Sequence, residues 1–580
     1  MDRHPAKILV ALSVIAVASF SMFGPQDKTP ASASYIVQGR SVDEIRSLMT
    51  EYGAEVTHEL GVIRAVAADL TDEQVAALRR NSDVRRVFSN EAVQVAGKPG
   101  GSKSSGGTNS SSAGTAMDTH YPSLVNANAV HDMGITGAGI GIAVLDTGLW
   151  KHDGIRYDMA GNTRLTGLYN AMTDTEAQSP LSGDDPGGHG THVASIAVSG
   201  LMTPEGLYNG IAPGAHLISV QAFDADGHGT YADVVRAIDW VITNRSRHKI
   251  RVLNLSFSAE ARSHYWDDPI NQAVMVAWQK EIFVVAAAGN QGPDPMTIGV
   301  PGNVPYVMTV GAMTDNFTPD FDADDALATF SSAGPTYEGF VKPDVVAPGG
   351  HMKGLVQGSS TLATAYPEFY ASDMYFEMSG TSQAAAVVSG IAALALEAEA
   401  WRSADELKCK IISAAKPAVT RLKGKDYLTY SVFQQGAGLV DAYAAVTNQT
   451  VDCANNGLHI DNDIDGVQHF GGHANQDADG NYFLMGELDS SESGYVWSNG
   501  YLWTDGTAWT NGYLWTDGYL WTEGYLWTDG GVNSNGYIWT DGDVTMQGYL
   551  WTDGGVNTNG YLWTDGGTEM ATMSSWVDQE

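Results

Sequence analysis

The feature that most constrains the fold is an alternation of short apolar runs with helical patterns between Tyr121 and Asn448. The apolar runs include "GIGIAVLD", "LISVQAF", "RVLNLSFS" and "IFVVAAAGN", and the helical patterns include "YADVVRAIDWVITNR" and "DPINQAVMVAWQKE". Buried strands that alternate with helices form a parallel sheet flanked by helices. The fold class predicted for residues 118–450 is therefore α/β, with functional polar residues just after the strands, where open α/β sheets place their sites.

Three motifs in this region contain the residue types that nucleophilic catalysis needs. Asp146 ends the apolar run "GIAVLD", His189 lies in "GGHGTHVAS", and Ser382 lies at the start of a helical run in "MSGTSQAAAVVSG". A serine hydroxyl is a poor nucleophile, so a histidine must accept its proton and a carboxylate must orient that histidine. A helix that begins at Ser382 would direct backbone N–H groups at an oxyanion, and Asn290 in "VVAAAGN" would add a side-chain donor.

Each motif alone has an ordinary structural explanation, such as a turn aspartate or a helix N-cap serine. Together, in the order Asp, His, Ser, they resemble the subtilisin-like serine proteases (subtilases). The resemblance extends from about residue 120 to 446 and includes the flanking segments "FSSAGP", "KPDVVAPGG" and "GAGLVDAYAAV". It implies a subtilisin-like fold and an endopeptidase that acts on proteins or peptides through an acyl-enzyme, with no cofactor needed for the chemistry.

One departure from the family pattern follows the serine motif. The family usually has a His-Pro pair there, whereas this chain has Ala386 and Val387. These residues fall one turn past Ser382 and remove no chemical group that the mechanism requires. In the histidine motif, we interpret the second histidine, His192, as structural.

The resemblance also implies where a substrate would bind. "DGHGTY" and "SFS" would flank the cleft and pair with extended substrate backbone by strand addition. Gly289 would form a wall and Gly299 the base of the P1 pocket, and a glycine at the base predicts a deep pocket that takes large apolar or varied residues. The alternative is that these glycines only make turns. The candidate substrate-binding residues are Gly227, Gly229, Ser256, Phe257, Ser258, Gly289 and Gly299.

A compact block precedes the large domain. Residues 35–97 show a β-α-β-β-α-β pattern, in which Thr71 and Gln74 form a capping-box pair at the second helix. A ferredoxin-like domain at this place resembles the inhibitory propeptide of the subtilases, which would make the enzyme's own propeptide one of its partners. A plain binding module is the alternative. The Gly- and Ser-rich residues 98–117 form a flexible linker by composition.

Residues 1–33 are typical of an export signal. Arg3 and Lys7 precede the apolar run "ILVALSVIAVASFSMF", and "ASA" fits a cleavage site. The run is short for a ~20-residue membrane span and contains serines, which favours cleavage over anchoring. The predicted location is secreted or cell-surface, where Cys409 and Cys453 could form one disulfide or remain two free thiols.

An acidic segment at residues 451–493 contains two Asp-rich stretches, "DNDIDG" and "NQDADG". Both have oxygen ligands at alternate positions and glycine at the sixth, as in the first half of a calcium loop. The twelfth positions hold Gly472 and Gly486 in place of glutamate. A structural calcium ion and acidic loops without metal therefore remain alternatives for the candidate ligands, Asp461, Asp463, Asp465, Asp477 and Asp479.

Glycine-led hexads of the type "GYLWTD" fill residues 494–566. Twelve hexads keep strict register, and nine have tryptophan at the fourth position. A six-residue period is a whole number of strand periods and does not match a helix face. The pattern predicts a β array, either a hairpin meander or a solenoid, with a disordered tail as the alternative. A row of aromatic residues on an exported protease suggests that the tail grips a polymer or a surface.

The net charge of −36 argues against nucleic-acid binding, which requires a basic face. Residues 451–580 contain 20 acidic residues and neither Lys nor Arg. The sequence therefore predicts a secreted, self-processed serine endopeptidase. The rival hypothesis is a surface-binding protein whose function lies in the tail, with the protease domain serving only to mature it.

Overall fold

The computed structural model describes most of the chain. The described residues are 32–95, 119–179, 183–319, 324–371, 374–422, 425–451, 453–476, 480–484, short repeat strands between 502 and 563, and 571–573. The predicted signal peptide and linker therefore lie almost entirely outside the described residues, as do Asp477 and Asp479.

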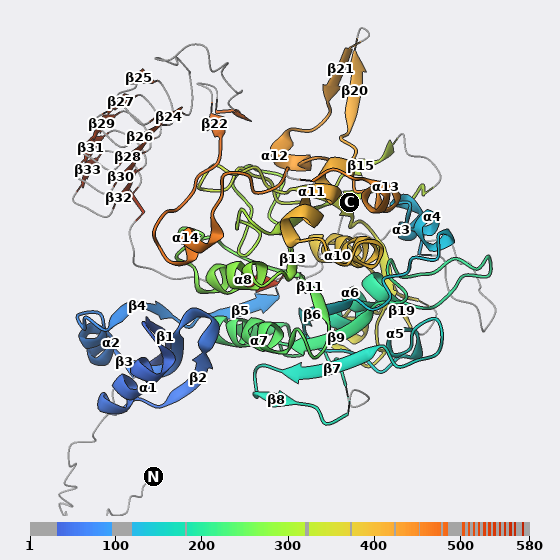
Figure 1. The fold of residues 1–580 in the computed structure, drawn as a ribbon, viewed down its shortest axis with the longest axis horizontal. Helices are drawn as coiled ribbons and strands as arrows, with labels where there is room; N and C mark the ends of the chain where they lie inside the picture. Colours follow the sequence, from blue (N-terminus) through green and yellow to red (C-terminus); the bar gives the residue numbers. More distant parts are fainter. Residues whose placement is uncertain are drawn as a thin grey trace, which may run out of the picture.

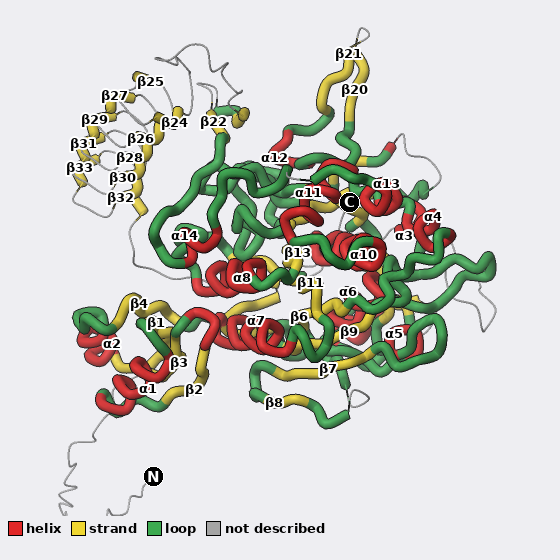
Figure 2. Tube along the Cα trace, viewed as in Figure 1, coloured by secondary structure: helices red, strands yellow, loops and turns green. Residues whose placement is uncertain are grey.

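A nine-stranded sheet forms the centre of the molecule (Figures 1 and 2). The strand order is β15-β14-β13-β11-β6-β9-β7-β8, and β16 also pairs with β14. Seven strands pair in parallel, whereas the short strands β8 and β15 pair antiparallel. The predicted α/β fold with a parallel sheet is thus confirmed. The strands are β6 (Gly141–Asp146), β7 (Leu165–Asn170), β8 (Thr175–Glu176), β9 (His216–Gln221), β11 (Ile250–Leu255), β13 (Phe283–Ala287), β14 (Met308–Thr314), β15 (Ala326–Leu327) and β16 (Val345–Pro348).

Helices cover both faces of this sheet, which is why strands such as β6 and β13 are buried along their whole length. The helices pack in pairs (Figure 1). Helix α10 (Thr381–Ala398) contacts α6 (His189–Val198), and α7 (Tyr231–Asn244) contacts α8 (Pro269–Gln279). Among the described residues, α10 alone is long and apolar enough to cross a membrane, but 89% of it is buried inside the fold. Its apolarity is therefore that of a core helix.

Shorter helices and strands complete the large domain. The helices are α3 (Tyr121–Leu124), α4 (Ala127–Asp132), α5 (Asp153–Arg156), α9 (Thr361–Ala365), α11 (Ala404–Ala414), α12 (Val432–Gln435) and α13 (Ala442–Thr447). The strands are β17 (Met352–Leu355), β18 (Tyr370–Ala371) and β19 (Tyr375–Met378) in one small sheet, and β20 (Val419–Leu422) and β21 (Lys425–Leu428) in a protruding hairpin (Figure 1).

The first domain follows the predicted β-α-β-β-α-β order. Its antiparallel sheet has the strand order β2-β3-β1-β4 and packs against two helices around its own apolar core. Thr71 and Gln74 form the predicted capping box. The elements are β1 (Ser32–Gly39), α1 (Val42–Glu51), β2 (Val56–Leu60), β3 (Ala65–Thr71), α2 (Asp72–Leu78) and β4 (Val84–Ser89).

The first domain docks on α7 and α8. The backbone N–H groups of Tyr231 and Ala232, in the first turn of α7, donate to Glu91 O at 3.1 Å and to Asn90 Oδ1 at 2.9 Å. Because N–H groups at the start of a helix have no intrahelical partner, the first domain satisfies donors that α7 leaves free. On α8, the amide of Gln38 donates to Oε1 of Gln272 at 2.7 Å.

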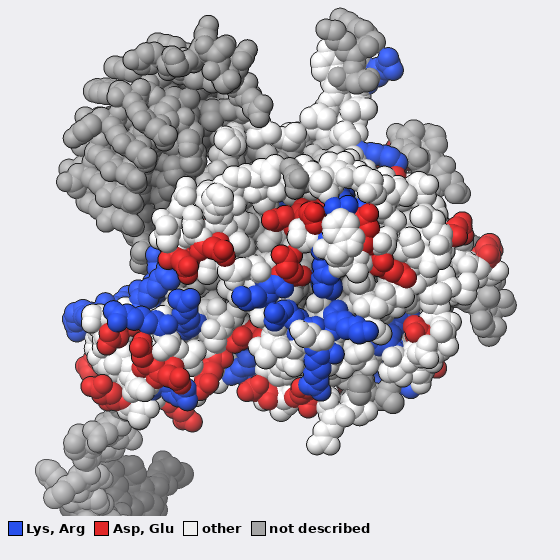
Figure 3. All heavy atoms as spheres, in the orientation of Figure 1, with Lys and Arg blue, Asp and Glu red and all other residues white. Residues whose placement is uncertain are grey.

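A C-terminal extension lies beside both α8 and the first domain. A disulfide between Cys409 on α11 and Cys453 joins it to the large domain, so of the two alternatives for these cysteines the structure has the disulfide. The extension contains α14 (Ile460–Ile464), β22 (Ala474–Gln476) and β23 (Tyr482–Leu484). In Figure 3, acidic side chains above the first domain face its basic edge. Between β4 of the first domain and the residues just before α8, Arg86 Nη2 lies 2.8 Å from Oδ1 of Asp267.

The repeats form two parallel sheets. Trp503 pairs in register with Trp515, twelve residues on, and consecutive strands alternate between the sheets, so two hexads make one coil. A hairpin meander would pair consecutive strands antiparallel, and the arrangement is therefore a solenoid. The six-stranded sheet contains β24 (Leu502–Thr504), β26 (Leu514–Thr516), β28 (Leu526–Thr528), β30 (Ile538–Thr540), β32 (Leu550–Thr552) and β34 (Leu562–Trp563). The five-stranded sheet contains β25 (Trp509–Thr510), β27 (Leu520–Thr522), β29 (Val532–Ser534), β31 (Val544–Met546) and β33 (Val556–Thr558).

The two repeat sheets differ in composition. In the six-stranded sheet, tryptophan holds the same register position in every strand. In the five-stranded sheet, only the first two strands have tryptophan there, at Trp509 and Trp521, and Asn533, Thr545 and Asn557 follow. The three hexads that lack aromatic residues therefore all fall in one sheet.

Candidate active site

The three residues of the predicted triad come from three elements that meet at the carboxyl edge of the central sheet. Asp146 is the last residue of β6, His189 is the first residue of α6, and Ser382 is the second residue of α10. All three are almost fully buried. Gly188, which precedes His189, has a φ of +99°, and a Cβ atom there would lie 2.8 Å from Oγ of Ser360. Only glycine suits that turn, which brings the histidine out of the loop and onto the helix.

The carboxylate of Asp146 and the imidazole of His189 are in direct contact. Oδ1 of Asp146 lies 2.7 Å from Nδ1 of His189 and also accepts the backbone N–H of Thr147 at 2.8 Å. Burial lowers the pKa of His189, but the negative charges of Asp146 and Asp185 and the hydrogen bond to Asp146 outweigh it, so the net pKa is raised. The imidazole can therefore accept a proton while Asp146 fixes its tautomer.

The second histidine of the motif has a different environment. Nε2 of His192 lies 3.0 Å from Phe376 O and 3.2 Å from Met352 O, which makes it a donor to backbone carbonyls. Burial lowers the pKa of His192 to about 3, so the side chain is neutral. These contacts hold α6 against β17 and β19, in agreement with the structural role predicted for His192.

The hydroxyl of Ser382 donates to Ser256 O at 2.9 Å. Nε2 of His189 is buried and has no hydrogen-bond partner among the residues that the structure describes. A serine that reacts through this histidine must therefore exchange the carbonyl of Ser256 for Nε2 of His189. Hydrogen bonds of this kind often tighten only when substrate binds.

Asn290 follows β13 and faces the start of α10. Its Oδ1 accepts the backbone N–H of Thr381 at 3.0 Å and the Thr381 hydroxyl at 2.9 Å. Because the oxygen is fixed by two donors, the amide Nδ2 is directed away from Thr381. The backbone N–H groups in the first turn of α10 add partial positive charge at the same place. Thr381 was not singled out in the sequence, although it directly precedes Ser382.

A second buried carboxylate, Asp185, joins the triad segments and was also missed by the sequence reasoning. Oδ1 of Asp185 accepts the hydroxyl of Thr147 at 2.8 Å and the N–H of Gly188 at 2.9 Å. Its Oδ2 accepts both the hydroxyl and the N–H of Thr191, at 2.6 and 2.8 Å. Asp185 thereby fixes the residue after Asp146 and both sides of His189. The sequence feature that could have identified Asp185 is its position four residues before His189 in "DDPGGHG".

The two segments predicted to bind substrate are edge strands that already pair with other parts of this chain. Strand β10 (His228–Thr230) pairs antiparallel with β5 (Ala92–Val95) at the end of the first domain, with Gly229 opposite Val93. Strand β12 (Phe257–Ala259) pairs antiparallel with β35 (Ala571–Met573), with Phe257 opposite Met573 and Ser258 opposite Thr572. Because β35 also pairs with β5, the order across the cleft is β10-β5-β35-β12. Gly227 lies in the turn before β10, with a φ of +76°.

The glycines predicted to form the P1 pocket both lie against Ser258. A Cβ atom built at Gly289 would stand 2.9 Å from Oγ of Ser258, and one built at Gly299 would overlap the same oxygen. The prediction of a deep pocket was based on the missing side chain of Gly299. In the structure, the hydroxyl of Ser258 lies where a Cβ atom of residue 299 would stand.

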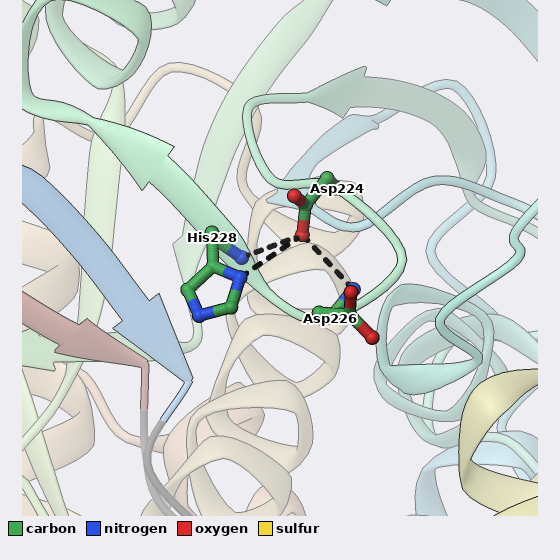
Figure 4. A group of neighbouring side chains, drawn as sticks. All are labelled: Asp224, Asp226 and His228. Atoms are coloured by element: carbon green, nitrogen blue, oxygen red, sulfur yellow. Dashed lines mark hydrogen bonds and ion pairs between the residues drawn. The ribbon is translucent and has the colours of Figure 1, made fainter. Parts of the chain in front are cut away.

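Among the described residues, one group of three side chains meets a simple distance criterion for holding a metal ion: Asp224, Asp226 and His228 (Figure 4). Oδ1 of Asp224 accepts the backbone N–H groups of Asp226 and His228 at 2.9 and 2.8 Å. These bonds form a local turn that leads into β10, which accounts for Asp224 without a metal.

The first predicted calcium stretch does not fit a calcium loop, because it contains α14. Asp463 is buried and accepts the hydroxyls of Tyr265 and Tyr306 at 2.5 and 3.1 Å, while its other oxygen lies 2.6 Å from Nδ1 of His469. Asp461 accepts from the side chain of Gln279, and Asp465 is the C-terminal cap of the helix. These three aspartates therefore do not converge as alternate ligands of a loop do.

Comparison with known proteins agrees with this architecture. The Subtilase family (Peptidase_S8) matches residues 137–443. The chain is 32% identical to serine protease AprX of Bacillus subtilis (strain 168) over 408 residues, which is 69% of this chain and 83% of that protein. It is 28% identical to subtilisin E of the same organism over 450 residues, which is 76% of this chain and 97% of that protein.

A solved structure shows the same fold. It is fervidolysin from Fervidobacterium pennivorans, described as a keratinolytic enzyme related to subtilisin, with a TM-score of 0.54 at 21% identity. The match covers 74% of this chain and 62% of that one.

The parallel sheet and the family match define the molecule as a serine endopeptidase of the α/β class. The chain belongs to the subtilase family, and the predicted enzyme class is thereby confirmed.

Proposed function

We propose that Asp146, His189 and Ser382 are the catalytic triad of this protease and that Asn290 stabilises the oxyanion. The observation that carries the proposal is the 2.7 Å contact between Nδ1 of His189 and Oδ1 of Asp146, at the sheet edge where Ser382 lies in the first turn of α10. The contact leaves Nε2 of His189 as the proton acceptor, because Nδ1 is bound to the carboxylate.

The reaction follows from this arrangement. The proton of Ser382 Oγ passes to Nε2 of His189 as a bond forms between Oγ and the scissile carbonyl carbon. The amide of Asn290 and the N–H groups of α10 stabilise the negative oxygen. The C–N bond then breaks, the leaving amine takes the proton from His189, and the acyl group remains on Ser382. Water repeats the sequence and releases the acid, so no cofactor takes part.

Labelling with a fluorophosphonate tests this assignment. The wild-type protein should be labelled at Ser382, whereas His189→Ala should be labelled far more slowly, because the hydroxyl then lacks its base. His192→Gln is the matched control, since that histidine contacts two backbone carbonyls and the side chain of Gln383 and forms no hydrogen bond to Asp146 or Ser382. Labelling of His189→Ala at the wild-type rate would remove His189 from the mechanism.

We further propose that residues 35–97 are an inhibitory propeptide and that its removal in the linker activates the enzyme. Two contacts support this: β5 pairs with the edge strand β10, and Asn90 and Glu91 bind the first turn of α7. A segment held on β10 stands where an extended substrate would pair, so substrate cannot enter until it leaves.

Two features support export to the cell exterior. The first 33 residues are typical of a signal peptide, and the Cys409–Cys453 disulfide is of a kind that persists in oxidising compartments. N-terminal sequencing and intact-mass analysis of protein from the culture medium test the export and the maturation sites together.

The solenoid favours a second function, binding to a polymer or surface. Six successive strands place tryptophan at one register position, and neighbouring strands in a sheet lie ~4.8 Å apart. Such a regular row suits a partner that also repeats. Deletion of residues 494–566 should leave hydrolysis of a small soluble peptide intact but reduce attack on an insoluble protein. Equal loss on both substrates would contradict a binding role for the tail.

A further inference from the structure

The position of the P1 side chain can be derived from the contacts around Ser382. Ser256 and Ser382 exchange hydrogen bonds, and the N–H of Gly289 donates to the Thr381 hydroxyl at 3.2 Å. The segment that begins at Ser256 and the segment that ends at Asn290 therefore lie on either side of Ser382. A carbonyl that Ser382 attacks, with its oxygen at Asn290, must direct its side chain between these two segments.

Ser258 lies inside that gap. Its neighbour Ala259 exchanges backbone hydrogen bonds with Val300 at 2.8 and 2.7 Å, which brings Gly299 against Ser258. Oγ of Ser258 lies 2.9 Å from where a Cβ atom of Gly289 would stand. Ser258 is 8% exposed, with strand β35 also paired along β12 beside it. The two glycines thus make room for Ser258 itself.

We propose that Ser258 narrows the P1 pocket and makes this enzyme prefer small residues, such as alanine, glycine or serine, at the cleavage site. The inference rests on the proposed function, because it takes Ser382 as the nucleophile and Asn290 as the oxyanion donor. A large P1 side chain would have to displace a hydroxyl that is packed between two backbone segments. A pocket that differs by one or two heavy atoms changes selectivity by roughly 10- to 200-fold.

The test uses the mature full-length enzyme and peptide p-nitroanilides of one sequence that differ only in P1, with alanine, leucine or phenylalanine. The wild-type kcat/KM should be highest for alanine. Ser258→Gly should raise the phenylalanine-to-alanine ratio of kcat/KM by about tenfold or more. Ser258→Val should lower that ratio further, because the isopropyl group fills more of the gap. A wild-type preference for phenylalanine or leucine would overturn the proposal, as would an unchanged ratio in Ser258→Gly.

Ser332→Ala is the matched control. The Ser332 hydroxyl also lies beside Gly289, but it accepts the N–H of Gln291 at 3.1 Å and is fully buried, so its loss should not change the P1 ratio. Fluorophosphonate labelling of each variant tests the proposed triad separately from the proposed role of Ser258. A wild-type enzyme that is not labelled at Ser382 contradicts the proposed triad. An enzyme that is labelled normally but keeps its P1 ratio in Ser258→Gly contradicts only the role of Ser258.

Discussion

Ser256 and Ser382 each donate a side-chain hydrogen bond to the other residue's backbone carbonyl, both at 2.9 Å. This reciprocal pair joins the residue after β11 to the first turn of α10 and fixes the backbone of Ser382, the proposed nucleophile, while its hydroxyl can exchange the carbonyl of Ser256 for another acceptor. One such bond contributes ~1 kcal/mol to stability, so loss of the Ser382 hydroxyl should not unfold the protein.

Ser382→Ala should therefore give a folded precursor without peptidase activity. We expect no cleavage of casein, no self-processing and retention of the first domain in the purified protein. Thermal unfolding should show a midpoint near that of an unprocessed His189→Ala precursor. Casein cleavage by Ser382→Ala at the wild-type rate would show that another residue is the nucleophile.

Asn290→Ala should lower kcat by ~10²–10³ with little change in KM, because the lost donor acts on charge that develops in the transition state. Thr381→Val is a second test, since it removes the hydroxyl that donates to Oδ1 of Asn290 and accepts the N–H of Gly289. If the hydrogen bond to Oδ1 contributes ~1 kcal/mol to holding the Asn290 amide in position, its loss should lower kcat about fivefold. An unchanged kcat in Asn290→Ala would remove this residue from the oxyanion site.

The acid limb of activity should depend on Asp185. In the proposed mechanism neutral His189 is the base, so kcat/KM should fall as the pH drops through the His189 pKa, which burial lowers and the negative charges of Asp146 and Asp185 raise, with a net rise. Burial raises the pKa of Asp185, and the hydrogen bonds from Thr191, Gly188 and Thr147 oppose this rise by favouring the ionised carboxylate. Asp185→Asn should therefore lower the pKa of His189 and extend activity to lower pH.

Asp153→Asn, at the start of α5, is the control, because it changes the formal charge by the same amount while its carboxylate is largely in solvent. The measurement is the pH profile of kcat/KM for both variants. If Asp185→Asn loses activity but keeps the wild-type acid limb, the role of Asp185 is only to hold the loops.

Residues 35–97, supplied as a separate polypeptide, should inhibit the mature enzyme at micromolar concentration. Gln38→Ala in that polypeptide should weaken inhibition about fivefold, because it removes a ~1 kcal/mol hydrogen bond to Gln272. Glu51→Ala, at the exposed end of α1, should inhibit like the unaltered polypeptide. Absence of inhibition by the unaltered polypeptide would favour a plain binding module.

The Cys409–Cys453 disulfide should stabilise the protein by restricting a 44-residue separation in the unfolded chain. Replacing both cysteines with alanine should lower the free energy of unfolding by about 2–4 kcal/mol. Thermal unfolding with and without reductant measures this, and the double variant should no longer respond to reductant. A midpoint that reductant leaves unchanged in the wild-type protein would contradict this contribution.

Much of the fold was predictable because it depends on local periodicity. The runs that became β6 and β13 are apolar along their length, as a strand covered on both faces requires. The capping pair Thr71 and Gln74 marked the start of α2. The repeat period predicted strands, but it did not distinguish a meander from a solenoid, because both have the same period along the chain.

The sequence by itself determined the residue types of the site, since Asp146, His189, Ser382 and Asn290 lie in motifs whose neighbours set the local turns and helix starts. Only the tertiary structure decided what depends on contacts between distant segments. Asp463 matched a calcium loop in spacing, yet it lies within α14 and accepts the hydroxyl of Tyr265, about two hundred residues away. The glycine at position 299 suggested an open pocket base, yet the hydroxyl of Ser258, from another segment, lies where a Cβ atom of residue 299 would stand. A spacing rule describes one segment at a time, whereas the packing of two segments settles what the space between them can hold.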